Sequence, residues 1–233
     1  MWVLPLIAAA VAFTFAGMLA VQFARRRRAY QLLWAIALVT YGLASLALML
    51  GALNGWSETE YQVYWALGAV LNVPFLAAGE LVLLFRQKWV VWVSWLFLVF
   101  SVAYTVSVLR GAAMDPAALA EQLPSGKEVF GAGSAAHRLP QLFSYPAYFV
   151  LVAGTLWSAW KMRGHAELKE RFVGTLLIAI GATIVAGGAT FAALGILTGF
   201  VLTLVAGIAV MFWGFLRASK PVAAPGPPAA SGS

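Results

Sequence analysis

The sequence predicts an all-α integral membrane protein, a bundle of seven transmembrane helices with its N-terminus outside and its C-terminus in the cytoplasm. Three observations predict this fold class. The 233 residues are 63% hydrophobic and only 10% charged, whereas a soluble domain carries about 25% charged residues. Seven apolar runs are each long enough to cross a bilayer. Finally, Lys and Arg gather in alternate loops between these runs.

The predicted spans follow from the need for about 20 apolar residues to cross roughly 30 Å of hydrocarbon. They cover residues 2–24, 30–52, 62–85, 89–109, 141–160, 172–193 and 196–216. The last two spans form one charge-free run that is too long for a single crossing, and we place the break at residues 194–199. Together the spans make one domain, residues 1–218. An Ala-, Pro-, Gly- and Ser-rich tail, residues 219–233, is expected to be disordered in the cytoplasm.

The orientation is predicted by the positions of the charges. Twelve of the 15 Lys and Arg residues fall on one side of the predicted membrane. These are Arg25 to Arg28, Arg86, Lys88, Lys161, Arg163, Lys169, Arg171, Arg217 and Lys220. The other side carries Arg110, Lys127 and Arg138 with five acids, Glu58, Glu60, Asp115, Glu121 and Glu128. By the positive-inside rule the first side is cytoplasmic, and we expect a multi-pass protein of the bacterial inner (plasma) membrane.

Several chemistries are excluded by the composition. The chain has no Cys, which removes disulfides, thiolate metal sites and cysteine nucleophiles. The two histidines, His137 and His165, are predicted on opposite sides of the membrane and cannot share a metal. All five lysines lie in loops or at helix ends, so none can form a Schiff base within a span. We therefore expect no enzyme activity, no catalytic residue, no metal, no cofactor and no nucleic-acid partner.

Glu80 is the one charged side chain placed well inside a predicted span. A carboxylate at that depth is costly, so it should be protonated, paired or facing a wet cavity. One interpretation is a proton-titrating group in a cavity open to the cytoplasm. The other is structural, an ion pair with Arg25, Arg26 or Arg163, or a hydrogen bond to another span.

Other polar side chains could share a pocket with Glu80. Tyr61 and Asn72 lie on one broad sector of the same span, in which Pro74 predicts a kink. The complete candidate ligand or proton site is Glu80, Asn72, Tyr61, Tyr41, Gln141, Tyr145 and Tyr148. Such a pocket would suit a small neutral or amphipathic molecule. Alternatively, each residue hydrogen-bonds between helices, a contact worth about 0.6 kcal/mol.

Four glycines of the sixth span, Gly174, Gly181, Gly188 and Gly195, lie seven residues apart. This interval returns to nearly the same helix face, and small residues let helices approach closely in lipid. We expect a tight contact with another helix, for which the seventh span is a candidate. A sliding surface in a transporter is the alternative.

The outer segment, residues 110–140, is the longest connection. Asp115-Pro116 predicts the start of a short helix that ends at Pro124. A connection of this length often serves as a lid or a binding loop. Trp56, Tyr61 and Trp65 lie at the outer ends of spans, where aromatic side chains are typical interfacial anchors.

Spans 1–3 and 5–7 can be laid over each other as two blocks that run in the same direction, and both open with Leu-Pro, at Leu4-Pro5 and Leu139-Pro140. Parallel repeats of this kind occur in transporters. In this topology and in Pro140-Gln141 the chain resembles the PQ-loop/SWEET group of seven-span transporters, although the first block has Pro5-Leu6 instead. It also resembles bacterial seven-span sensor modules, which normally precede a signalling domain that these residues do not contain.

We therefore expect a transporter-like protein that binds or moves a small neutral or amphipathic solute, proton-coupled through Glu80, with the outer segment as a lid. The alternative is a non-catalytic seven-helix receptor or accessory subunit. Such a subunit would bind lipid or a partner membrane protein through the glycine face and the outer segment. Membrane lipid, a second copy of the chain and another membrane protein are the expected partners.

Overall fold

The computed structural model describes residues 3–85, 87–165 and 168–219, and every regular element within these ranges is a helix. Seven helices are long and apolar enough to cross a membrane, which indicates a multi-pass membrane protein. Parts of three predicted segments lie outside the described residues. They are residue 2 of the predicted first span, Arg86 of a basic loop, and residues 220–233 of the tail.

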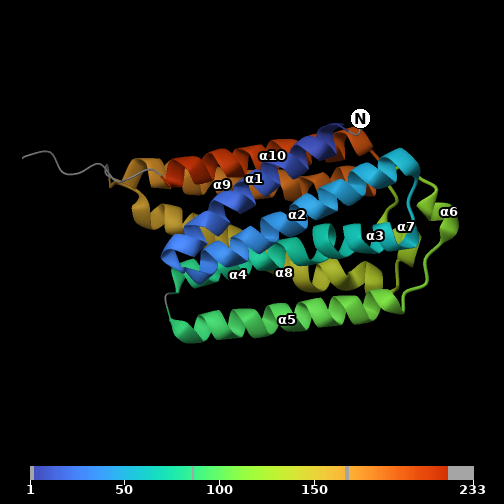
Figure 1. The fold of residues 1–233 in the computed structure, drawn as a ribbon, viewed down its shortest axis with the longest axis horizontal. Coiled ribbons are helices and arrows are strands. Elements are labelled where there is room, and N and C mark those ends of the chain that lie inside the picture. The colour runs from blue at the N-terminus through green and yellow to red at the C-terminus, as the bar shows by residue number, and fades with distance from the viewer. Residues whose placement is uncertain (1–2, 86, 166–167, 220–233) are drawn as a thin grey trace, which may run out of the picture.

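The helices follow one another as shown in Figure 1. Six long helices are continuous: α1 (Val3–Arg26), α2 (Ala29–Asn54), α5 (Lys88–Arg110), α8 (Ala135–Met162), α9 (Lys169–Ala193) and α10 (Leu197–Ala218). The third span has three segments, α3 (Glu58–Tyr64), the π-helix η1 (Trp65–Leu71) and α4 (Asn72–Leu84). Two short helices, α6 (Pro116–Leu119) and α7 (Gly126–Phe130), lie between α5 and α8.

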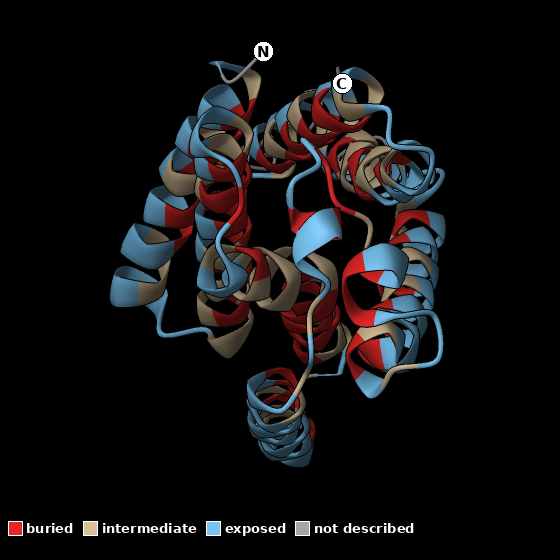
Figure 2. Cartoon of the chain, turned by 90° about the vertical axis from the view of Figure 1, so that its right-hand side faces the viewer, coloured by how far each residue is buried: buried red, intermediate tan, exposed pale blue. Residues whose placement is uncertain are grey.

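Six of the seven spans form a closed ring, in which α4 represents the third span. Each packs against the next in the order α1, α2, α4, α8, α9, α10, and α10 packs against α1. The helix α5 lies outside this ring against α4, η1 and α8, and Figure 2 shows it standing apart with most of its surface exposed. The two predicted blocks are therefore two arcs, α1–α2–α4 and α8–α9–α10, which meet at an α4–α8 seam and an α1–α10 seam.

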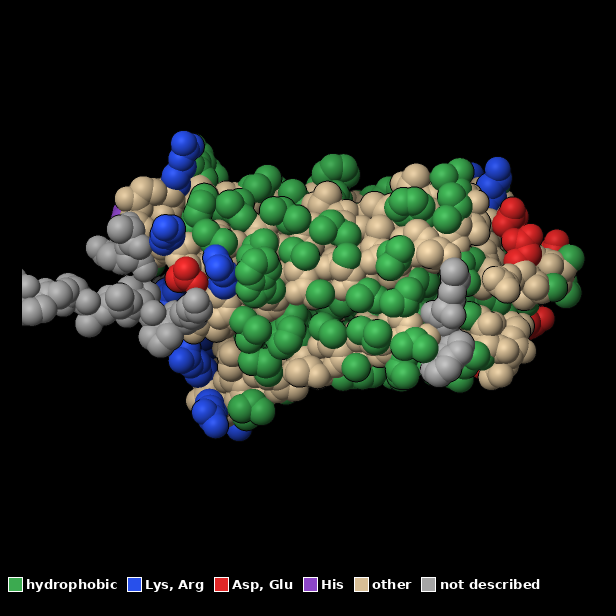
Figure 3. Space-filling model, turned by 90° about the horizontal axis from the view of Figure 1, so that it is seen from above, with side chains coloured by type: hydrophobic (Ala, Val, Ile, Leu, Met, Phe, Trp, Pro, Cys, Tyr) green, Lys and Arg blue, Asp and Glu red, His purple; other side chains and the backbone are tan. Residues whose placement is uncertain are grey.

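The charged residues lie at the two ends of the ring, with an apolar belt between them (Figure 3). We call the end with Arg25 to Arg28, Lys88, Lys169 and Arg217 the basic end, and the end with Glu58, Glu60, Asp115, Glu121 and Glu128 the acidic end. The exposed belt includes large apolar side chains such as Trp92, Leu96 and Phe149, which are 76%, 72% and 69% exposed. Such a belt suits contact with hydrocarbon.

The irregular third span is held by its neighbours. Pro74 has no backbone N–H, so the carbonyl of Val70, four residues earlier, lacks its usual helical donor. The Ser144 hydroxyl of α8 donates to this carbonyl at 2.8 Å and to that of Ala69 at 2.7 Å. The departure from α-helical geometry thus lies in η1, about one turn before the predicted kink at Pro74. The Val70 carbonyl has a hydrogen-bond donor in Ser144, as a backbone group within a membrane requires.

The glycine face of α9 packs against α10. A Cβ on Gly181 would lie 2.6 Å from the carbonyl oxygen of Gly207, and one on Gly214 would lie 2.6 Å from that of Gly174. Gly188 faces Thr203 of α10. Gly195 has a different role, because it adopts a φ of +68° in the turn between the two helices, inside the predicted break at residues 194–199.

Residues 111–134 cover the acidic end of the ring, and we call them the cap. Asp115 accepts a hydrogen bond from the Ala117 N–H at 2.9 Å and so starts α6, at the position that Asp115-Pro116 predicted. The helix ends at Leu119, so the predicted end at Pro124 is wrong. α8 begins at Ala135, so the connection is shorter than the predicted segment 110–140 and Pro140 lies within a helix.

Two aromatic side chains of the first half of the chain hydrogen-bond to the cap, and a third, Trp65, hydrogen-bonds to the first turn of α8. Trp56 donates to the Gln122 carbonyl at 3.2 Å, Tyr61 to that of Pro124 at 3.1 Å and Trp65 to that of Ala136 at 3.0 Å. Trp56 is 8% exposed and Tyr61 is fully buried. The prediction that these two residues anchor the protein at the membrane surface is therefore wrong, because the cap covers them.

Candidate functional site

A small apolar cavity lies on the axis of the ring. Each ring helix contributes one side chain to it: Phe15, Leu38, Leu76, Leu151, Ile178 and Met211, which we call the axial cluster. Trp34 of α2 completes the wall, and its indole N–H is already bonded to the Leu76 carbonyl at 3.0 Å. The cavity volume is about 20 Å³, which exceeds the roughly 10–15 Å³ that one water needs. A water also needs two or more polar partners, so we expect the cavity to be dry.

On the acidic side of the axial cluster, three polar side chains tie the ring helices together. Tyr41 on α2 donates to the Leu204 carbonyl of α10 at 2.9 Å, and Asn72 on α4 donates to the Ala37 carbonyl of α2 at 2.6 Å. Tyr148 on α8 donates to the Thr183 hydroxyl of α9 at 3.1 Å. Each donor lies three or four residues, about one helical turn, from Leu38, Leu76 or Leu151. We call these three pairs the hydrogen-bonded tier.

On the basic side of the axial cluster, one turn after Leu76, lies Glu80. Its side chain is 2% exposed and sits in the α4–α8 seam. Gly154 of α8 leaves room for it, since a Cβ there would lie 2.7 Å from the Glu80 Cγ. The Ser158 hydroxyl, one turn further along α8, donates to Glu80 Oε1 at 3.4 Å.

Within the described residues this long hydrogen bond is the one polar contact of the Glu80 carboxyl. The ion pairs with Arg25, Arg26 and Arg163, expected under the structural interpretation, are not present there. A buried carboxyl with so little compensation is costly in a membrane. Pairing with a described cation therefore does not account for an acid at this position, whereas the other structural interpretation, a hydrogen bond to another span, is met by Ser158 of α8.

The structure does not bring all the predicted site residues into one pocket. Tyr41, Asn72 and Tyr148 form the tier, Glu80 lies beyond the axial cluster, and Tyr61 is beneath the cap. Gln141 and Tyr145 are exposed on the outer surface of α8, Tyr145 by 56%. The seven residues are spread along the length of the bundle.

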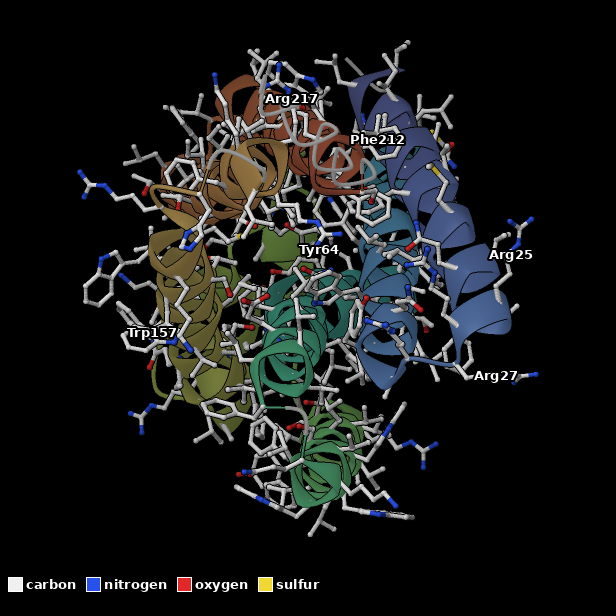
Figure 4. The ribbon with its side chains drawn as sticks, turned by 90° about the vertical axis from the view of Figure 1, so that its left-hand side faces the viewer. Arg25, Arg27, Tyr64, Trp157, Phe212 and Arg217 are labelled. Carbon is white, nitrogen blue, oxygen red and sulfur yellow. The ribbon has the colours of Figure 1, made fainter. Side chains whose placement is uncertain are left out.

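Several residues of this region were not identified from the sequence. They are the axial cluster and the glycine and serine beside Glu80. Tyr64, which Figure 4 labels near the centre of the ring in a view from the basic end, was also not identified, and it packs against Trp56 and Tyr61 beneath the cap. One signal was available, because Gly154 and Ser158 share a face of α8 with Leu151. Nothing in the local sequence says which helix that face meets.

The positions of the acids and histidines bear on metal binding. Within the described ranges, no three His, Asp or Glu side chains are close enough to hold a metal ion. His137 and His165 lie near opposite ends of the bundle, at the start of α8 and after its end.

No protein-family model, no curated protein and no solved structure matches this chain. The resemblances in topology and in Pro140-Gln141 therefore rest on sequence features alone. Because function belongs to sites and not to folds, a function for this chain has to be inferred from the ring axis and Glu80.

Proposed function

We propose that this chain is a transporter-like protein of the bacterial inner membrane, which binds or moves a small neutral or amphipathic solute with Glu80 as its proton-titrating group. The observation that carries the proposal is the position of Glu80. It is buried, has no cationic partner among the described residues, and lies one turn from the cavity on the ring axis. Acids inside membrane spans commonly serve proton relays and substrate pathways.

The residues around Glu80 support a role other than packing. A glycine within a helix costs about 1 kcal/mol relative to alanine, and Gly154 accepts this cost at the one place where the Glu80 side chain crosses the seam. Gly154 thus gives the Glu80 side chain the room that it needs in the seam. The pair Glu80 and Gly154 therefore favours a functional acid.

The charge distribution supports an orientation for this function. Under the positive-inside rule the basic end faces the cytoplasm and the acidic end with its cap faces outside. Glu80 is then on the cytoplasmic side of the axial cluster, where it would exchange protons with the cell interior. The cap covers the opposite entrance.

The decisive variant is Glu80→Gln, which keeps the shape of the side chain and removes its titration. We expect proteoliposomes of the wild-type protein, loaded with a pH-sensitive dye, to show pH-dependent proton flux after an external pH step. We expect Glu80→Gln to abolish it and Glu121→Gln, which changes an exposed acid of the cap, to retain it. Unchanged pH dependence in Glu80→Gln would remove the proposed role of this residue.

The alternative, a receptor or accessory subunit, receives less support. Gly174, Gly181 and Gly188 face α10 of the same chain, so the glycine face is not available to a partner. An accessory subunit would have to bind through the outer segment, the other contact surface expected of it.

A further inference from the structure

The helix ring creates a space that its own backbone does not fill. Neighbouring helices pack about 8–10 Å apart, so six of them in a closed ring surround an axis about as wide as one helix. The seventh long helix, α5, lies outside the ring and does not occupy this axis. Side chains alone must close it.

At the level of the cavity the axis is lined by an apolar layer. The axial cluster takes a side chain from every ring helix, and Trp34 joins it from α2. None of these side chains is charged, and the only polar hydrogen among them, the Trp34 N–H, is already bonded to a backbone carbonyl. Constrictions lined in this way exclude water and can gate a pore by dewetting.

Corresponding positions of the two blocks supply part of this layer. Leu76 of α4 and Met211 of α10 stand the same number of residues apart as Pro5 and Pro140, which open the two blocks. Phe15 and Leu151, on the first helix of each block, deviate from this interval by a single residue. Leu38 and Ile178, on the second helix of each block, are 140 residues apart and depart from the interval by five. Two of the three helix pairs therefore supply the layer from corresponding positions.

Polar groups flank the layer on both sides. Tyr41 and Asn72, the two buried donors of the hydrogen-bonded tier, lie one turn toward the acidic end, and Glu80 lies one turn toward the basic end. The third pair, Tyr148 with Thr183, lies at the exposed surface of the bundle. From the acidic end to the basic end the order is therefore the cap, the buried donors Tyr41 and Asn72, the axial cluster, and Glu80 in the α4–α8 seam. This order is expected of a pathway with one dry barrier between two polar regions.

We propose that the ring axis is the pathway of this protein and that the axial cluster is its hydrophobic gate, which passes small uncharged solutes and excludes hydrated ions such as potassium. This inference rests on the proposed transport function and specifies its route and its selectivity. The gate is closed in this structure, because its cavity holds no more than a water-sized molecule.

The test shortens two side chains of the axial cluster, one on α2 and one on α8. We expect Leu38→Ala/Leu151→Ala in proteoliposomes to raise glycerol permeability about tenfold or more over wild type, which corresponds to a barrier lowered by about 1.4 kcal/mol. Potassium permeability should stay unchanged. A second variant, Leu38→Asn, keeps the side-chain size but adds polar atoms, and it should raise water permeability in the same way.

The matched control is Leu43→Ala/Leu142→Ala, which makes the same change on the same two helices at positions that are 42% and 55% exposed. It should leave glycerol permeability at the wild-type value. If neither gate variant leaks while both keep a cooperative unfolding transition, the axis is an ordinary core and the proposal falls. Equal leakage in the control would also overturn it.

The same experiment separates this inference from the proton role of Glu80. A leak that persists when Glu80→Gln is added to Leu38→Ala/Leu151→Ala shows a pathway whether or not Glu80 titrates. If Glu80→Gln abolishes pH dependence but Leu38→Ala/Leu151→Ala does not leak, the proposed function stands and the route lies elsewhere.

Discussion

Glu80 and Gly154 face each other across the α4–α8 seam, and this pair decides how the acid is held. The seam on the other side of the ring is filled differently, with Phe15 against Phe212 and Phe215 at centroid distances of 5.3 and 4.7 Å. One junction between the two blocks is thus aromatic and the other contains an acid over a glycine. We infer that the α4–α8 seam, which contains the acid, is the one that serves the proposed function.

A double-mutant cycle measures this contact. Gly154→Ala places a methyl group 2.7 Å from the Glu80 Cγ, and overpacking of this kind costs about 1–3 kcal/mol. In a Glu80→Ala background the obstructing Cγ is absent, so Gly154→Ala should be neutral or stabilising by up to about 1 kcal/mol. The measurement is the free energy of unfolding in detergent micelles.

Gly17→Ala on α1 is the control, because a Cβ there meets nothing within 4 Å. It should not destabilise the protein in either background. Additive effects of Gly154→Ala and Glu80→Ala would show that the two side chains do not share the seam as described.

How far the sequence predicts individual residues depends on what makes them unusual. Glu80 could be identified because a charge inside an apolar run is conspicuous. Leu38 and Leu43 could not be distinguished, although one lines the axis and the other is 42% exposed. Lipid is as apolar as a protein core, so the hydrophobic contrast that marks the inner face of a soluble helix is missing.

At the scale of helices, the α9–α10 pair packs through glycines that bring the two backbones close together. Gly181 lies against Gly207, and Gly174 lies against Gly214. The seven-residue interval predicted a tight contact, and the structure supplies the partner, the neighbouring helix in the chain. Gly195 keeps the interval but serves the turn, which the interval alone could not reveal.

Gly181→Ala tests this helix pair. The added Cβ would meet the backbone of α10, 2.6 Å from the Gly207 oxygen and 2.8 Å from the Met211 nitrogen. Since backbone cannot rotate away as a side chain can, the helices must separate, and we expect a loss of about 1–3 kcal/mol in unfolding free energy. Gly187→Ala on the same helix, with nothing within 4 Å, should instead be stabilising by roughly 0.5–1 kcal/mol. Equal stability of the two variants would contradict the packing described.

At the scale of the whole molecule, the charge pattern and the ring were not equally predictable. The two charged ends follow from basic and acidic loops that alternate along the chain, a pattern that needs no knowledge of which helices touch. The order of the helices around the ring depends on contacts between distant residues, such as Tyr41 with Leu204 and Ser144 with Val70. The position of α5 outside the ring, which leaves the axis to side chains, has no local signal at all.

The orientation of the ring is open to a direct test, because a chain without cysteine accepts single reporter cysteines with no background. Ala132→Cys lies in the cap and Ser219→Cys follows α10 at the basic end, and both positions are exposed. Since basic ends are retained in the cytoplasm, a membrane-impermeant maleimide should label Ala132→Cys in intact cells and Ser219→Cys only after permeabilisation. The reverse pattern would place Glu80 on the outer side of the gate. Labelling of both from outside would mean an even number of crossings after the cap, which three spanning helices, α8, α9 and α10, do not allow.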